Sequence, residues 1–306
     1  GANGVKDTSG NPLAADDTWS FTTAGLSFVD TTASDFNAGS LGTGTYVSQP
    51  GDGEVILRPA EGQEFSGGPG LPAGWSSTPW TGGSSTVSGG ALRVEGALAI
   101  TDASYGAGRS LEFVATFGPE TFQHAGLADS SDFNDFAMFS TNQSTSQLQA
   151  RTSFGGNVNI GLPGQYIGSP HRYRIEWDAA QVRFFVDGAT APVSTHNGTF
   201  GVPLRPIASD FTSSAVPLSV DWLRLSPFAA AGTFESRVFD AGPGQSVNWG
   251  ALSWQATTPV GTSVALSVRT GNTPTPDGTW RAFTPLAASG GDIPGTSRYV
   301  QYRAAL

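Results

Sequence analysis

The sequence predicts an all-β protein built from antiparallel β-sandwiches. Short runs of Val, Ile, Phe, Tyr and Trp recur between clusters of Gly, Pro, Asp and Asn, which is the pattern of strands joined by turns. No stretch of ten or more residues carries apolar side chains at helical spacing. The 306 residues include 41 Gly and 20 Pro but also 19 Phe and 8 Trp, so turn formers are abundant and large side chains suffice for two or three domain cores.

Residues 1–25 are expected to be the end of a first domain. The segment 7–12 predicts a turn, and Trp19, Phe21 and Thr23 share one face of the strand that follows it. This pattern resembles the last strands of bacterial Ig-like domains, which occur as tandem arrays in surface proteins. We therefore interpret residues 1–25 as the C-terminal remnant of such a domain, and the chain as part of a longer protein.

Residues 26–60 read as short strands that cannot close a core alone. The C-terminal residues 229–306 supply further strands, in which Val264, Leu266 and Val268 alternate with more polar positions. We therefore expect residues 28–36 or 55–57 to form backbone pairs with strands after Gly232. The resulting split sandwich is similar to the accessory β-sandwich units of many secreted bacterial proteins, which are galactose-binding-like or fibronectin-like.

Residues 61–228 are predicted to be a domain inserted into this sandwich. Dense Gly, Pro and Ser in residues 62–90 predict a loop that leads into it. Apolar and polar residues then alternate in the strands 109–116 and 172–177. The dipeptide Asp187-Gly188 is a strong hairpin signal. Because the insertion leaves and returns through neighbouring chain segments, its two ends must lie close together.

The inserted segment resembles a known fold. Tyr173-Arg-Ile-Glu-Trp177, followed by Val182-Arg-Phe-Phe-Val-Asp-Gly188 and Ser194-Thr-His196, is similar to the matching hairpin of concanavalin A-like domains. That group contains laminin-G-like modules, legume-type lectins and laminarinase-type glycosidases. The resemblance implies a jelly roll with one concave and one convex sheet. The split unit of residues 26–60 and 229–306 would be a second, smaller β-sandwich beside it. A fold alone does not give an activity.

No catalytic motif is found. Laminarinase-type enzymes carry Glu-x-Asp-x-x-Glu on one strand, with carboxylates placed for glycoside hydrolysis. This chain has only Glu176-Trp177-Asp178, with Gln181 in the last position, where it cannot donate a proton. Three histidines could act as bases, but there is no cysteine and no Gly-x-Ser-x-Gly elbow before a helix. We therefore predict no catalytic residue and no enzyme activity.

A carbohydrate site is predicted on one face of the inserted domain. His124 and Phe122 share a face of the alternating strand 121–128, and Arg151 follows on the neighbouring strand. Sugars are bound by this mixture of fixed donors and aromatic rings. The alternative is an ordinary half-polar sheet face. The expected carbohydrate-binding residues are His124, Arg151, Phe122, Trp75 and Trp80.

Carboxylate clusters predict a structural Ca²⁺ ion. Asp129, Asp132, Asn134 and Asp135 concentrate hard oxygen ligands, although they lack the order of an EF-hand. Asp30 and Asp240 could form a second site if the split sandwich brings them together. Asx-turns and strand-end caps are the alternative explanation of both sets.

Charge and composition restrict the partners. A net charge of −10 with a single lysine argues against nucleic acid, and no apolar run reaches the roughly 18 residues of a membrane span. Few charges and many Ser, Thr and Gly favour an extracellular or cell-surface location. We therefore expect a non-catalytic carbohydrate-binding or adhesion module of a multidomain bacterial protein. Its partners would be a glycan or cell-surface polysaccharide and other domains of the parent chain. The alternatives are a glycosidase or polysaccharide lyase with unrecognised catalytic residues, and a structural spacer of an adhesin.

Overall fold

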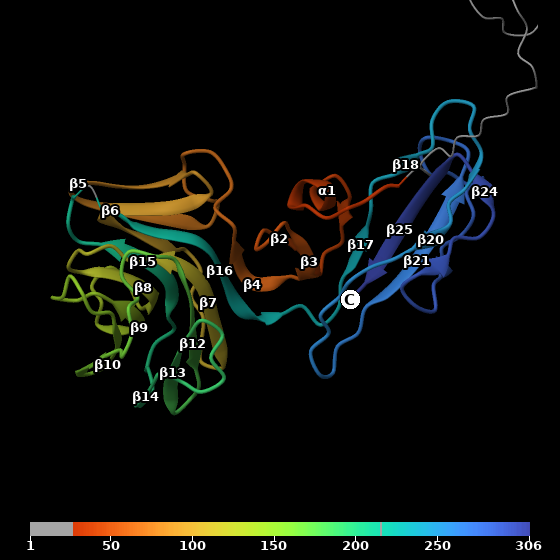
Figure 1. Cartoon of the computed structure of the whole chain (residues 1–306). Helices are drawn as coiled ribbons and strands as arrows, with labels where there is room; N and C mark the ends of the chain where they lie inside the picture. The colour runs from red at the N-terminus through yellow and green to blue at the C-terminus, as the bar shows by residue number, and fades with distance from the viewer. Residues whose placement is uncertain (1–26, 215) are drawn as a thin grey trace, which may run out of the picture.

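The computed structural model describes residues 27–214 and 216–306, and nearly all of its regular elements are β-strands (Figure 1). The predicted all-β class is therefore confirmed. The predicted Ig-like remnant at residues 1–25 lies outside the described residues. The helix α1 (Ala33–Asn37) is five residues long, and none of the helices in the described part of the chain is long and apolar enough to cross a membrane.

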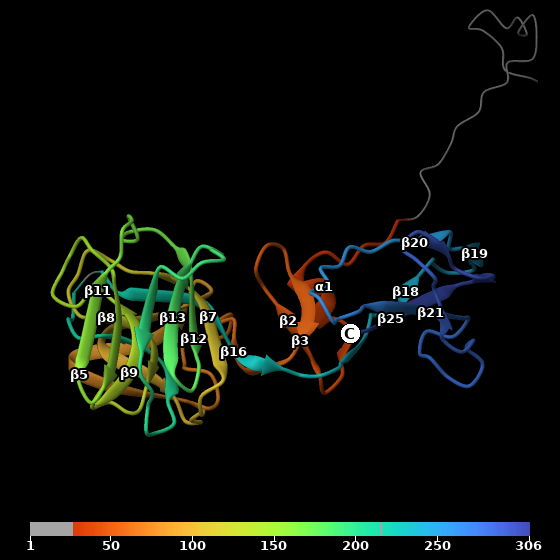
Figure 2. The same cartoon turned by 90° about the horizontal axis from the view of Figure 1, so that it is seen from below.

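The larger body is a jelly roll in which antiparallel strands form two facing layers (Figures 1 and 2). One layer has the order β11, β10, β9, β8, β15, β6 and β5, and it is joined to the other through β6 and β16. Its strands are β5 (Trp75–Ser88), β6 (Ala91–Thr101), β8 (Gln123–Ala128), β9 (Asp135–Ser140), β10 (Gln149–Phe154), β11 (Asn157–Gly161) and β15 (Arg205–Asp210). The other layer contains β4 (Pro59–Gln63), β7 (Arg109–Thr116), β12 (His171–Trp177), β13 (Gln181–Val186), β14 (Ser194–Asn197) and β16 (Leu218–Phe228).

The predicted alternation places the core between these layers. Tyr173 and Ile175 of β12 are fully buried, whereas their neighbours in the strand are partly exposed. The ring of Tyr173 lies 4.6 Å from that of Phe139, which belongs to β9 in the opposite layer. Burial of such rings is the main source of stability for a sandwich of this kind. The hydrophobic pattern thus fixes which face of each strand points inward.

Two local expectations have different outcomes. Asp187 and Gly188 both have positive φ, 52° and 72°, as the central residues of a type I′ turn require, and this turn begins the connection of residues 187–193 between β13 and β14. The loop predicted for residues 62–90 is wrong in its second half, because β5 runs from Trp75 to Ser88 and pairs with β6. Dense Gly, Pro and Ser in this segment indicated a loop, but the neighbouring apolar strand β6 supplies the pairing partner.

The smaller body is a second set of antiparallel strands (Figure 1). Its main sheet has the order β1, β17, β25, β21, β22, with β18 also paired to β25, and short two-stranded pairs accompany it. The main-sheet strands are β1 (Ser40–Leu41), β17 (Thr233–Glu235), β18 (Phe239–Asp240), β21 (Ala265–Gly271), β22 (Thr284–Pro285) and β25 (Tyr299–Ala305). The pairs are β2 (Thr45–Ser48) with β3 (Glu54–Leu57), β19 (Val247–Asn248) with β24 (Thr296–Ser297), and β20 (Ala251–Leu252) with β23 (Gly291–Asp292). Its core contains Phe239, Val268, Ile293 and Val300.

Segments far apart in the sequence meet where the two bodies join. Strand β1 pairs with β17, so Leu41 lies opposite Phe234. The N-terminal segment thus pairs with a strand after Gly232, but through residues 40–41 rather than the predicted 28–36 or 55–57, because 55–57 belong to β3, which pairs with β2. The backbone N–H of Ala229 donates to the carbonyl of Arg58 at 2.8 Å, where the chain enters and leaves the jelly roll. These contacts support the proposed insertion of residues 61–228 between residues 26–60 and 229–306, and the domain boundaries remain a proposal.

A buried ion pair links the hairpin of β2 and β3 to the jelly roll. The guanidinium of Arg224, on β16, donates to Glu64 Oε1 at 3.0 Å and to Ser48 Oγ, on β2, at 2.7 Å. Both charged side chains are about nine-tenths buried. Removing one member of such a pair leaves the other charge buried without compensation.

We expect Arg224→Ala to lower the free energy of unfolding by about 3–5 kcal/mol, because Glu64 then loses its counter-ion. The matched control is Arg172→Ala. Arg172 is 53% exposed in its ion pair with Glu112, so its loss should cost less than about 1 kcal/mol. Chemical denaturation of both variants measures the difference. Equal losses in the two variants would contradict the role given to the buried pair.

Candidate functional site

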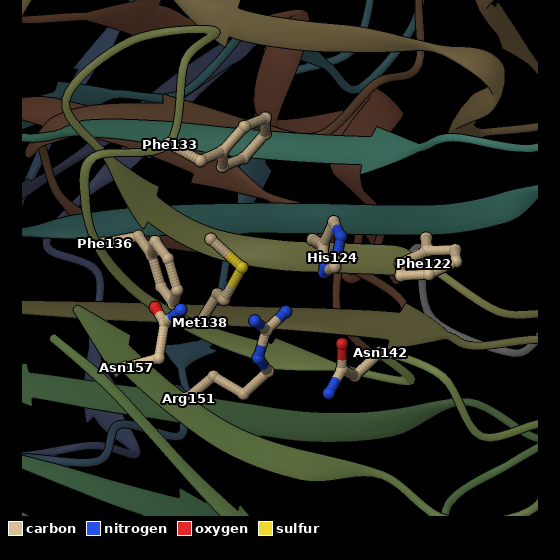
Figure 3. A pocket seen from close by; sticks show the side chains of 8 residues that line it. All are labelled: Phe122, His124, Phe133, Phe136, Met138, Asn142, Arg151 and Asn157. Carbon is tan, nitrogen blue, oxygen red and sulfur yellow. The ribbon is translucent and has the colours of Figure 1, made fainter.

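A groove lies on the outer face of the layer formed by β8, β9 and β10 (Figure 3). It consists of two adjoining hollows with cavity volumes of about 300 and 250 Å³, which share Phe122, His124 and Phe133. The first hollow is lined by Phe122, His124, Phe133, Phe136, Met138, Asn142, Arg151 and Asn157. The second is lined by Trp80, Phe122, His124, Ser131, Phe133 and Phe211.

Strand register brings the polar residues of the groove together. His124 on β8 lies opposite Ser140 on β9, and Met138 on β9 lies opposite Arg151 on β10. Directly opposite side chains in an antiparallel pair point to the same face. Gly126 allows β8 and β9 to lie this close, since a Cβ there would come within 2.6 Å of Met138 Cα.

Strained backbone is concentrated at the groove. Phe122, Phe133 and Asn142 all have positive φ, at 62°, 54° and 47°. A bulky residue rarely adopts this conformation, and each case costs about 1–3 kcal/mol that the surrounding contacts must offset. Such strain clusters at binding and catalytic sites. The groove is therefore the strongest candidate for the functional site.

His124 is held as a neutral imidazole. Ser140 Oγ accepts a hydrogen bond from the backbone N–H of Asn142 at 2.8 Å, and it lies 2.7 Å from His124 Nδ1. The Ser140 hydroxyl proton is therefore assigned to the bond with Nδ1, which leaves the imidazole proton on Nε2. Burial, and then the positive charge of Arg151, lower the pKa of His124 from 6.5 to about 3.

Arg151 reaches the same space from β10 (Figure 3). Its Nε–H donates to Asn159 Oδ1 at 2.6 Å, and one terminal N–H makes a long contact of 3.4 Å with Ser140 Oγ. The guanidinium also lies 5.2 Å from the ring centre of Phe136. Burial lowers the pKa of this guanidinium, although it stays charged at every physiological pH.

The residues predicted to bind carbohydrate are only partly brought together. His124, Arg151 and Phe122 line the first hollow as expected, and Trp80 lines the second beside Phe211, with ring centres 5.2 Å apart. Trp75 instead lies in the main core, where its indole N–H donates to Glu61 Oε1 at 3.2 Å. It is not part of the groove.

Several groove residues were not predicted from the sequence. They are Phe133, Phe136, Met138, Asn142, Asn157, Ser131 and Phe211. Alternation along β9 could have indicated Phe136 and Met138 as partners of His124, had the strand order been known. Phe133 and Phe211 lie in loops whose conformations have no local sequence signature.

Three of the carboxylates proposed as calcium ligands have protein partners. Asp129 Oδ1 accepts the backbone N–H of the next residue, Ser130, at 2.8 Å. Asp30 lies 2.8 Å from the guanidinium of Arg237, and Asp240 accepts two hydrogen bonds from Arg298. Within residues 27–214 and 216–306, no three His, Cys, Asp or Glu side chains are grouped closely enough to hold a metal ion. The oxygen-rich loop 129–135 remains a proposed calcium site.

Carboxylates are absent from the described lining of the groove. Glu176, from the incomplete motif, lies on β12 of the other layer and forms an ion pair with Arg183. His196 is buried between Thr152 and Ser194, to which its two ring nitrogens are hydrogen-bonded. The ring nitrogens of His171 are hydrogen-bonded to Ser169 and Asp187. None of these groups lines the groove.

No protein-family model and no curated protein matches the sequence. Solved structures match at the level of the fold. A structure described with endo-acting O-glycanases of the human gut microbiota is 13% identical, with a TM-score of 0.43, over 56% of this chain and 100% of that chain. A beta-1,3-glucanase from Mycobacterium marinum is 13% identical, with a TM-score of 0.42, over 55% and 98%. A pseudo beta-1,3-glucanase of Mycobacterium tuberculosis is 17% identical, with a TM-score of 0.41, over 56% and 99%.

One expectation is corrected by these structures, and another is supported by the strand arrangement of this chain. Their glycosidase descriptions contradict the predicted non-catalytic module and the prediction of no enzyme, and they agree better with the glycosidase alternative. The concanavalin A-like jelly roll is supported by the layered strands described above. At these identities and TM-scores the likeness concerns the fold, so the activities of those proteins are not transferred to this chain.

The neutral state of His124 makes stability depend on pH. Between about pH 6.5 and 3 the unfolded histidine takes up a proton that native His124 does not, so the free energy of unfolding falls as the pH falls through this window. Buried His196, whose pKa is also lowered, adds to the same slope. We expect His124→Gln to have a shallower slope, measured by urea denaturation at several pH values. Identical slopes for variant and parent would contradict the assignment.

Calcium at the loop 129–135 is tested by melting temperature. A bound ion should raise the melting temperature in millimolar Ca²⁺ relative to chelator, because the ion binds the folded state alone. Asp132→Asn should remove this difference in melting temperature. Asp240→Asn should retain it, because the Asp240 side chain is hydrogen-bonded to Arg298 and lies outside the loop. An unchanged melting temperature of the parent protein would discard this site.

Proposed function

We propose that this chain is a carbohydrate-active protein whose groove over β8, β9 and β10 receives a stretch of a glycan. The observation that carries the proposal is the combination of aromatic side chains with the neutral donor His124 and the guanidinium of Arg151 in one strained groove. Aromatic faces bind the C–H faces of sugar rings, and fixed donors bind their hydroxyl groups.

The two hollows suit an extended ligand. The second hollow is the more aromatic, with Trp80 beside Phe211, whose side chain is 61% exposed. The first holds the polar groups His124, Asn142 and Arg151. A sugar stacked in the second hollow would therefore place its neighbour against the donors of the first.

Hydrolysis of a glycan in this groove would require carboxyl groups beside the bond that breaks. Glycosidases generally use two carboxyl groups that flank the scissile bond. Since the described lining contains none, the acids would have to come from the adjoining loop, in which Asp132 lies between the groove residues Ser131 and Phe133. Asp129 and Asp135 flank the same loop. Catalysis must therefore be measured separately from binding.

A panel of soluble polysaccharides tests the proposal, with binding followed by calorimetry and cleavage by the release of new reducing ends. We expect at least one polysaccharide to bind. Release of reducing ends that is lost in Asp132→Asn would support a glycosidase. Absence of binding to every member of a broad panel would overturn the assignment of the groove.

The aromatic hollow gives a specific prediction. We expect Phe211→Ala to weaken glycan binding about tenfold, because loss of one stacking ring costs roughly 0.5–1.5 kcal/mol beyond the buried area. The matched control is Phe228→Ala, since Phe228 is also exposed, at 45%, but lies at the end of β16 away from the groove. Calorimetric titration compares the two. Equal affinities in both variants would show that the second hollow takes no part in binding.

An extracellular or cell-surface location and a place in a longer multidomain chain also remain proposals. They rest on the small fraction of charged residues and the abundance of Ser, Thr and Gly in the sequence. A glycan partner of this kind is compatible with such a location.

A further inference from the structure

The groove contains a positive charge that the protein does not neutralise. Eight of the fourteen arginines form ion pairs with carboxylates of the described residues, and Arg151, which lines the groove, is one of the six that do not. The side chains that Arg151 contacts, Asn159, Ser140 and Phe136, are all neutral. Arg151 is half-buried, so water compensates its charge only in part. An unpaired guanidinium in such a place is a cost unless something else binds it.

Hydrogen-bond donors surround the same space. A guanidinium has five N–H groups, and Arg151 uses one on Asn159 and one on Ser140. Its remaining N–H groups stay available to a ligand. The Nε2–H of His124 adds a neutral donor at the same hollow. The amide nitrogen of Asn142 donates instead to Gln149 Oε1 at 3.2 Å, outside this set of donors. This set of donors matches a ligand that only accepts hydrogen bonds.

The surroundings strengthen an ionic contact. Phe133, Phe136 and Met138 form apolar walls beside the guanidinium, and an interaction between charges is stronger where water is partly excluded. The residues that line the groove include no carboxylate that would repel an anion, and the nearest acids along the chain, Asp129, Asp132 and Asp135, belong to the adjoining loop. The chain as a whole nevertheless carries a net charge of −10, which disfavours a densely charged polyanion at long range.

We infer that the groove recognises a sugar that carries a carboxylate, a uronic acid unit within a glycan, and that Arg151 binds this carboxylate with its planar fork. The inference rests on the proposed glycan-binding function and names its substrate class. A carboxylate fits because its two oxygens can accept two parallel N–H groups from one guanidinium. The apolar hollow beside Phe211 would hold the neighbouring ring.

The test uses matched ligands on the unmodified chain. Oligomers of galacturonate, glucuronate and mannuronate are each compared with their carboxyl-reduced forms, which keep ring, linkage and length but are neutral. We expect an acidic oligomer to bind about ten- to a hundredfold more tightly than its reduced partner, as one charge-assisted bidentate contact provides. Equal or tighter binding of the neutral forms overturns this inference while leaving the proposed function standing. If neither acidic nor neutral glycans bind, the proposed function fails with it.

Variants then assign the preference to a residue. Arg151→Gln should abolish the preference for the acidic ligand, whereas Arg151→Lys should keep part of it, because the ammonium retains the charge without the fork. Arg172→Gln, on the other layer, should bind like the parent. A preference that survives in Arg151→Gln would overturn the assignment. Tighter binding of a sulfated neutral oligosaccharide than of every uronate would likewise overturn the choice of a carboxylate.

Discussion

The strict alternation of β9 is the constraint on which both the core and the groove depend. Phe139 points inward and contacts the rings of Phe113, Tyr173 and Phe184, which hold the two layers together. Phe136 and Met138 point to the other face and line the groove. Because side chains alternate with a period of two, a slip of one residue would exchange the two sets. Packing of the interior therefore fixes the chemistry of the exterior.

The main features of the fold could be predicted from the sequence because they depend on local patterns. Alternation in β12 and the turn at Asp187-Gly188 identified a hairpin, and the resemblance built on it led to the jelly roll. The segment 75–88 shows the limit of such patterns. Its Gly and Pro residues are unfavourable in strands, and pairing with β6 decides that the segment forms a strand.

The site was predictable only in part. His124, Phe122 and Arg151 could be placed on one face from parity and chain order, and all three line the groove. The positions of Trp75 and Phe133 depend on long-range packing and on a strained backbone, neither of which has a local signature. The absence of carboxylates from the described lining could not be foreseen either, because which side chains share a groove follows from the order of strands in the sheet.

The way the chain enters and leaves the jelly roll has a mechanical consequence. Arg58 and Ala229 are joined by a backbone hydrogen bond, so residues 59–228 form a loop that is closed at its base. Tension applied along the described chain would pass from residues 27–58 into residues 229–306 through the paired strands β1 and β17 and the contact of Phe28 with Phe239. The jelly roll lies outside this path of load. Under such tension the smaller body would therefore deform before the jelly roll, and the groove would keep its shape.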